Sequence, residues 1–203
     1  MAKSFITPEA ILSYPWLLKP QPAQDAGGKA KYSAAFVIPR EGRNSPLVQA
    51  LEKAAIAIAV EKFGPEAAVK LQTGKLHYPF HADPEDVKDK GYPEGSLYFS
   101  ARSEERPGMV LPWPDPAVET TAGERPKPKR ATEEEVKRYF FAGAYVHAEI
   151  SLFAFDRNGK KGIGVGLNNL QFLRDGKRLD GRRAPDDVFE ADETLAPAEL
   201  AGL

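Results

Sequence analysis

The stretch that decides the fold runs from Gly143 to Asp175 and reads GAYVHAEISLFAFDRNGKKGIGVGLNNLQFLRD. From Tyr145 to Phe155, polar or aromatic residues alternate with aliphatic ones, which predicts a long β-strand with two distinct faces. The tetrapeptide DRNG at 156–159 favours a tight reversal, because Asn and Gly tolerate a positive φ. In the return strand, aliphatic residues and glycines occupy opposite faces: Ile163, Val165 and Leu167 against Gly162, Gly164 and Gly166. We expect one long twisted hairpin with a packed face and a partly bare one.

The glycine face needs a physical reason, because glycine in a strand costs backbone entropy and packs nothing. Two compatible interpretations stay open. The glycines allow the sheet to curve into a small barrel, or they admit the backbone or flat rings of a ligand. A nucleotide-binding loop fits poorly, because its glycines lie between a strand and a helix N-terminus, whereas these alternate within a strand.

The composition indicates one globular domain. The chain has 203 residues, of which 42% are hydrophobic, and this is enough for a substantial core. Cysteine is absent, which excludes disulfides and thiolate zinc sites and fits a reducing cytosol. The N-terminus has no signal pattern, and no apolar run approaches the ~18 residues of a membrane span. We expect a cytoplasmic protein with no membrane partner.

The net charge of -1 conceals an uneven distribution. Residues 125–183 contain 14 Lys/Arg and 7 Asp/Glu, whereas residues 184–203 contain six acids and no base. A basic region followed by an acidic end favours a surface that binds a polyanion and an acidic segment that competes with this polyanion. For any single charged cluster, the alternative is a solvated face. We predict a main domain at 1–183 and an acidic, mobile tail at 184–203.

Before the hairpin, short strands alternate with one substantial helix. The helix follows an N-cap at Ser45 and stops at Gly64, and Thr132 with Glu135 predicts a short second helix through a capping box. The apolar stripe of the long helix comprises Leu47, Leu51, Ala54, Ala55, Ile58 and Phe63. The expected strands are Ala10–Tyr14, ended by Pro15 and followed by packed Trp16 and Leu17, then Lys31–Ile38, Ser96–Arg102 and Met109–Leu111. Residues 72–95 and 112–131 read as loop insertions. Five to six strands with one inserted helix suit a mainly β fold, an OB-fold barrel with extended loops.

Catalytic and metal chemistry find little support in the sequence. There is no cysteine and no Gly-x-Ser-x-Gly elbow. His77 and His81 flank Pro79, which disfavours the helix that would align them on a metal. We expect no enzymatic activity, no metal and no cofactor.

Aromatic and basic residues on the predicted strands offer a different chemistry. Rings stack on the bases of single-stranded nucleic acid while cations follow its phosphates. The alternative for each ring is a place in the core, because a period of two does not show which face of the strand is exposed to solvent. The expected stacking residues are Tyr32, Tyr98, Tyr145 and Phe153. The expected phosphate contacts are Lys31, Arg102, Lys160, Lys161, Arg174 and Lys177.

Four phrases carry a resemblance to a known family: KYSAAFVIP, LYFSARSEERPGMV, FAGAYVHAEISLFAFDRNGKKGIGVGLNNLQFLRDG and DDVFEADE. They resemble phage-type single-stranded-DNA-binding proteins, once known only as a domain of unknown function and similar to the DNA-binding replication protein of phage T7. The resemblance covers roughly residues 10–190 and is most specific at Phe141–Gly176. It implies an OB-fold with a helix after the second strand, sequence-tolerant binding and an acidic C-terminus. The tail ends in LAPAELAGL, without the terminal aromatic residue of several single-strand binders.

These observations predict a non-catalytic protein that binds single-stranded DNA with little sequence preference. It would serve phage replication, recombination or repair in the cytoplasm of a bacterial host. Its expected partners are single-stranded DNA and, through the acidic tail, replication proteins, and we expect a monomer or homodimer. The alternative is a protein-interaction or virion-assembly module built on the same barrel.

Overall fold

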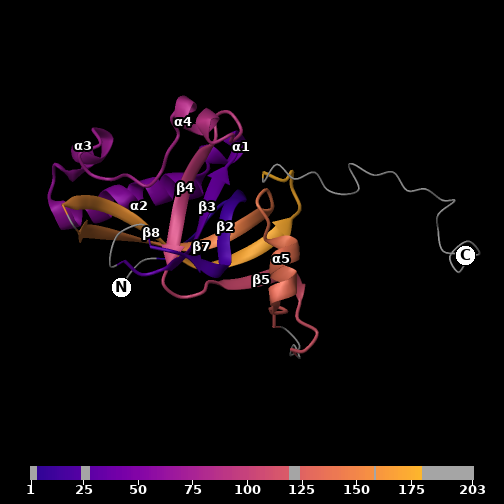
Figure 1. Cartoon of the computed structure of the whole chain (residues 1–203). Coiled ribbons are helices and arrows are strands. Elements are labelled where there is room, and N and C mark those ends of the chain that lie inside the picture. The colour runs from indigo at the N-terminus through magenta and orange to yellow at the C-terminus, as the bar shows by residue number, and fades with distance from the viewer. Residues whose placement is uncertain (1–3, 24–27, 119–123, 158, 180–203) are drawn as a thin grey trace, which may run out of the picture.

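The computed structural model describes residues 4–23, 28–118, 124–157 and 159–179 and contains one eight-stranded sheet (Figure 1). The sheet order is β1-β7-β2-β3-β4-β8-β5-β6, and β7 also pairs with β8. This additional pairing closes β2, β3, β4, β8 and β7 into a five-stranded barrel, as in an OB-fold. The strands are β1 (Ser4–Ile6), β2 (Ala10–Gln21), β3 (Lys31–Ile38), β4 (Leu97–Ser103), β5 (Gly108–Pro114), β6 (Pro128–Arg130), β7 (Tyr145–Arg157) and β8 (Lys160–Arg174).

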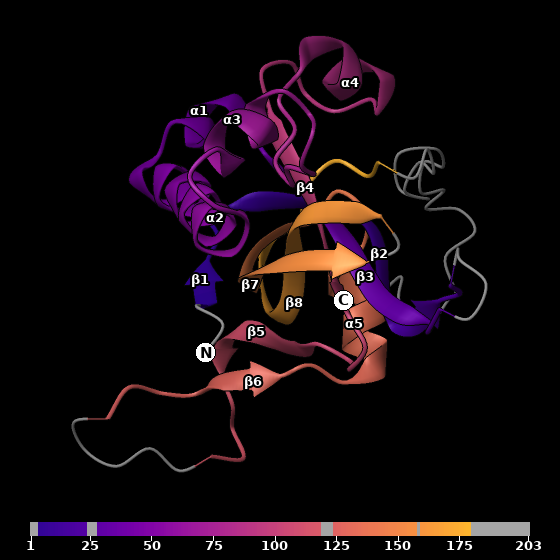
Figure 2. The same ribbon diagram turned by 90° about the vertical axis from the view of Figure 1, so that its left-hand side faces the viewer.

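The mainly β, OB-fold class is therefore confirmed, although the predicted count of five to six strands is too low. The two strands missed, β1 and β6, have three residues each. Such short segments cannot display a period of two. The helices are α1 (Arg40–Arg43), α2 (Pro46–Phe63), α3 (Ala67–Gln72), α4 (Pro84–Asp89) and α5 (Glu133–Tyr139). Figure 2 shows α4 and the β5–β6 pair at opposite ends of the molecule.

The long hairpin forms as its alternation predicts. β7 and β8 pair antiparallel from Tyr145 opposite Arg174 to Arg157 opposite Lys160. Its aliphatic face is buried in the barrel and comprises Val146, Ala148, Ile150, Leu152, Ile163, Val165 and Leu167. Between the two strands, Gly159 takes a φ of 76°, which completes the reversal without a Cβ clash.

The glycines of β8 leave space for other parts of the same chain. A Cβ on Gly162 would lie 2.4 Å from the carbonyl oxygen of His77, whose backbone crosses here. A Cβ on Gly164 would lie 2.6 Å from the ring of Phe153. Close approach is thus part of the reason for these glycines, but the approaching groups belong to this chain.

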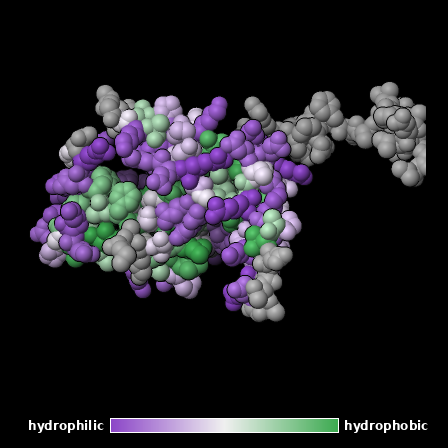
Figure 3. Space-filling view, turned by 90° about the horizontal axis from the view of Figure 1, so that it is seen from below, coloured by the Kyte–Doolittle hydropathy of each residue, from purple (hydrophilic) through white to green (hydrophobic). Residues whose placement is uncertain are grey.

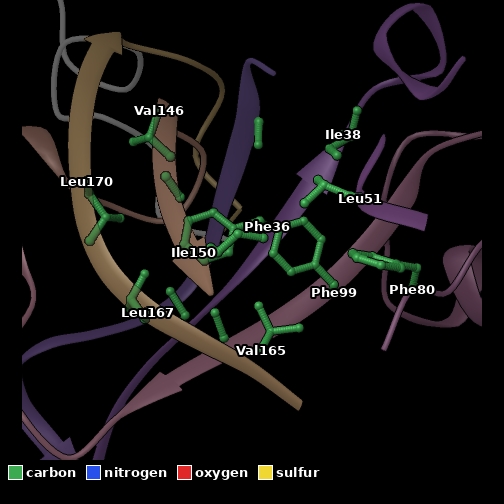
Figure 4. Packing of buried hydrophobic residues seen from close by; sticks show 14 of the residues in the cluster. Phe36, Ile38, Leu51, Phe80, Phe99, Val146, Ile150, Val165, Leu167 and Leu170 are labelled. Carbon is green, nitrogen blue, oxygen red and sulfur yellow. The ribbon is translucent and has the colours of Figure 1, made fainter. Parts of the chain in front are cut away.

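The core fills the barrel and continues under α2. Phe36 and Phe99 stack with ring centroids 5.4 Å apart, and Phe80 meets Phe99 edge-on at 5.5 Å (Figure 4). From α2, Leu51 packs into the same cluster. The capping of α2 is as predicted, since Ser45 Oγ accepts a hydrogen bond from Val48 N at 3.4 Å.

The predicted apolar stripe of α2 is wrong at one position. Leu47 is half exposed, and Val48 next to it is buried instead. The prediction for α5 is confirmed, because Thr132 and Glu135 form a reciprocal capping box. In the predicted loop at 72–95, α4 begins at an N-cap, Asp83, that accepts hydrogen bonds from two backbone N–H groups.

The prediction that the first strand ends at Pro15 is also wrong. Tyr14 takes a positive φ of 45°, and the pairing with β3 shifts register between Ser13 and Trp16. This bulge accommodates Pro15, which lacks the N–H that a regular strand pairing needs, and the strand continues after it. Leu17 is then buried as expected, whereas Trp16 stays 43% exposed.

Two predicted regions extend beyond the described residues. In the predicted insertion at 112–131, β5 and β6 pair antiparallel, and residues 119–123 lie outside the described residues. The predicted acidic tail at 184–203 also lies outside them. Within the described part of the chain, none of the helices has the length and apolarity to cross a bilayer.

Candidate nucleic-acid interface

A groove of about 870 Å³ runs between β4 and the β7–β8 hairpin. β4 contributes Tyr98, Ser100 and Arg102 to its lining, and the hairpin contributes a second wall. The segment 74–81 forms the third wall, and Lys31 at the start of β3 lies at one end. In OB-folds, the second and third barrel strands and the loops beside them hold oligonucleotides. The groove occupies the corresponding place here, because β3 and β4 are the second and third strands of the barrel.

Aromatic rings follow one another along this groove. His81 stacks on Tyr98 with ring centroids 5.0 Å apart and planes at 26°. The ring centroid of His77 lies 6.3 Å from that of His81 and 5.9 Å from that of Phe155. Phe153 adds a ring that is 46% exposed and lies over the backbone of Gly164. These flat faces form a surface on which unpaired bases can stack.

The segment that carries the two histidines is held by backbone bonds to both neighbouring strands. His77 N donates to Lys161 O at 2.9 Å, and Ile163 N donates to His77 O at 3.0 Å. His81 and Tyr98 exchange two N–H···O bonds, each of 2.8 Å. The backbone at His77 and His81 is therefore held by β8 and β4, which the sequence spacing of residues 77 and 81 does not reveal.

Burial keeps both histidines neutral near pH 7. It is the largest cause that lowers the pKa of His77, and His81 and Arg102 lower this pKa further. Burial also dominates the lowered pKa of His81, which Asp86 partly opposes. The same burial raises the pKa of Tyr98, whose hydroxyl keeps its proton. The groove therefore presents uncharged rings, with its positive charge on other side chains.

Those positive charges are Lys and Arg side chains along the same groove: Lys31, Lys75, Arg102, Arg157, Lys160 and Lys161. Among the described residues, Lys75, Arg102, Arg157 and Lys160 form no ion pair. Lys161 lies 2.8 Å from Asp156, and Lys31 lies 3.5 Å from Glu104. None of the described residues that line the groove is acidic. The combination of unpaired cations and flat rings suits a single-stranded polyanion with bases.

The fold places the sequence-predicted site residues in two groups. Six line the groove: Tyr98, Phe153, Lys31, Arg102, Lys160 and Lys161. The other four do not. Tyr32 pairs with Ser103 and lines no part of the groove.

The remaining three of the four lie toward the other end of the hairpin. The guanidinium of Arg174 covers the ring of Tyr145 at 3.5 Å and pairs with Glu9 at 2.6 Å. Lys177 lies beside Gly143, because a Cβ added to Gly143 would meet the backbone carbonyl oxygen of Lys177. None of the ten predicted DNA contacts is tested here, and the arrangement favours the six that line the groove over the other four.

Several groove residues were absent from the predicted set: Lys75, His77, His81, Phe155 and Arg157. Phe155 and Arg157 share the period-two face of Phe153, so the alternation was a usable signal for both. The histidines gave no such signal, because isolated bridges to Tyr98 and Gly162 bring them to the groove. The described residues contain no group of three or more His, Asp or Glu side chains that could hold a metal ion.

The sequence matches the family of the Enterobacter phage Enc34 single-stranded-DNA-binding protein over residues 3–199. The chain belongs to this family. A protein of Acyrthosiphon pisum secondary endosymbiont phage 1, p50, is 28% identical over 173 residues, which are 84% of this chain and 83% of p50. The resemblance to phage-type single-strand binders is thereby confirmed.

Solved structures agree with the fold of this Enc34-family chain. The bacteriophage Enc34 protein in complex with single-stranded DNA matches with a TM-score of 0.67 at 19% identity, over 87% of this chain and 89% of that one. The T7 single-stranded-DNA-binding protein gp2.5 matches with a TM-score of 0.55 at 13% identity, over 90% and 98% of the two chains. At these identities the likeness shows the fold alone.

Proposed function

We propose that this Enc34-family protein binds single-stranded DNA in the groove between β4 and the β7–β8 hairpin. It does so with little sequence preference and without catalysis, and it serves phage DNA replication, recombination or repair in the host cytoplasm. The observation that carries the proposal is the run of rings from Phe155 to Tyr98 beside unpaired cations. Membership of a family named for single-stranded-DNA binding supports it.

The mechanism follows from the chemistry of the lining. Bases stack on Phe153 and the groove rings, and every base has a π-face, so stacking tolerates any sequence. Phosphates lie against Arg102, Arg157 and Lys160, and their binding releases counterions from the strand. A duplex hides its base faces within its own stack, so it gains only the phosphate contacts.

A fluorescence titration with labelled oligonucleotides tests the proposal. We expect tight binding of an oligothymidine, weaker binding of a duplex of equal length, and a steep loss of affinity as salt rises. Arg102→Gln should weaken binding and reduce the salt slope by about 0.7, the value for one phosphate contact on a single strand.

Arg174→Gln is the matched control, because Arg174 lies outside the groove and is paired with Glu9. This variant should bind like the wild type. Equal affinity for single and double strands, or no binding at low salt, would contradict the proposal. The second outcome would favour the alternative, a protein-interaction or virion-assembly module.

A further inference from the structure

A second, smaller groove of about 340 Å³ continues the main groove past the end of β4. The two grooves share three cationic residues, Lys31, Arg102 and Arg157. Beyond the shared residues, the lining of the smaller groove includes Lys29 and Glu104. A strand that follows the main groove toward Arg102 would therefore enter the smaller one.

The carboxylate of Glu104 lies between two lysines of this smaller groove. Its Oε2 is 3.0 Å from Lys29 Nζ, and its Oε1 is 3.5 Å from Lys31 Nζ. The hydrogen bond from Lys29 is the largest cause that lowers the pKa of Glu104, so the group is charged at neutral pH. A phosphodiester offers the same two features, one negative charge and two oxygens that can accept from separate ammonium groups.

The contact between Glu104 and the lysines is also easy to replace. All three side chains are partly or largely exposed to solvent, and exposed ion pairs contribute little net stability. By contrast, the cations Arg102 and Arg157, which line both grooves, have no ion pair among the described residues. Glu104 lines only the smaller groove, whereas Arg102 and Arg157 line both grooves.

We propose that the smaller groove is a second phosphate subsite, which Glu104 occupies in the free protein and which a sufficiently long strand takes over. This inference rests on the proposed function and extends it. Short strands fill only the main groove and leave Glu104 in place. Longer strands displace the carboxylate and gain the contact with Lys29, so Glu104 sets the dependence of affinity on strand length.

The test compares wild type and Glu104→Gln on oligothymidines graded from about 4 to about 16 nucleotides, the range of site sizes of OB-folds. Below a threshold length, the two proteins should bind equally. Above it, the variant should bind about two- to tenfold more tightly at low salt, as expected when exposed ion pairs no longer compete. In both proteins the salt slope should become steeper by about 0.7 for each phosphate that a strand adds beyond the threshold length.

Two further variants separate this effect from general charge. Glu105→Gln removes the same charge one residue away, at an exposed side chain that lines neither groove, and should leave the affinity nearly unchanged. Lys29→Gln should weaken binding of the long oligothymidines and leave the short ones unaffected, because Lys29 lines only the smaller groove.

Three results would overturn the subsite. One is equal affinity of wild type and Glu104→Gln at every length, another is an equal gain with Glu105→Gln, and the third is no loss with Lys29→Gln on long strands. A wild-type protein that binds none of the oligothymidines would contradict the proposed function itself, so the two failures are distinguishable.

Discussion

The side chain of Phe153 is 46% exposed and its ring lies over Gly164, although Phe153 is within a strand. Because it contributes little to the core, its removal should cost little folding stability. Phe153→Ala should therefore weaken binding of single-stranded DNA by about 1–3 kcal/mol, the contribution of one stacked base, with a nearly unchanged melting temperature. Titration and thermal denaturation of the same sample measure both quantities.

The matched control for this prediction is Tyr145→Ala. Tyr145 is on the same strand and the same face, but Arg174 covers its ring away from the groove. This variant should bind DNA like the wild type. A loss of about 3–5 kcal/mol of stability in Phe153→Ala would instead identify Phe153 as a core residue.

The two groove histidines should make stability depend on pH. Burial lowers their pKa below the ordinary value of 6.5, so the unfolded chain binds protons more readily than the folded one. Stability is therefore highest above pH 6.5, falls as the pH decreases below it, and levels off under the lowered values. Melting temperatures between pH 8 and pH 5 measure the effect.

The double variant His77→Gln/His81→Gln should lose most of this dependence. The carboxylates with lowered pKa, such as Glu104, act only below about pH 4.5, outside this window. An unchanged pH profile in the double variant would show that the groove histidines are not its source.

At the scale of elements, β8 combines a strand with an attachment point for another segment. The backbone of His77 bonds to Lys161 and Ile163 across Gly162. Gly162→Ala places a Cβ against this backbone, which cannot move aside as a side chain can. We expect a loss of about 1–3 kcal/mol in the free energy of unfolding, the usual cost of overpacking, together with weaker DNA binding.

Gly164→Ala is the informative comparison on the same strand. Its Cβ meets only the ring of Phe153, which is exposed and free to rotate away. This variant should lose DNA affinity with a smaller loss of stability than Gly162→Ala. Urea denaturation measures the stability of both variants, and titration measures their DNA affinity. Equal losses of stability in Gly162→Ala and Gly164→Ala would contradict this expectation.

The sequence predicted those elements whose own residues carry the pattern. The alternation in β7 and β8 and the caps of α2 and α5 are local, and each was confirmed. The passage of β2 beyond Pro15 was missed, because it depends on a bulge at Tyr14 that pairing with β3 supports. The place of segment 74–81 in the groove was missed for the same reason, since only long-range backbone hydrogen bonds bring its two histidines there.

At the scale of the whole molecule, the main groove gathers six cationic side chains, and none of the described residues that line it is acidic. On the face in Figure 3, hydrophobic groups lie in separate patches between hydrophilic side chains. Residues 184–203 carry six acids and no base. Because an attached segment has a high effective concentration, these acids are expected to compete with DNA for the basic track.

Deletion of residues 186–203 tests this competition. The shortened protein should bind single-stranded DNA more tightly at low salt, and the gain should vanish as salt screens the attraction. Titrations of both proteins over a salt series supply the measurement. Equal affinities at every salt concentration would exclude the tail as a competitor and leave contacts with replication proteins as its proposed role.

The proposal that single-stranded DNA lies between β4 and the β7–β8 hairpin can be checked with a crystal structure of the protein and a short oligothymidine. We expect bases against Phe153 and Tyr98 and phosphates within hydrogen-bond distance of Arg102 and Arg157. An oligothymidine bound instead along Tyr145 and Arg174, with the groove unoccupied, would contradict it.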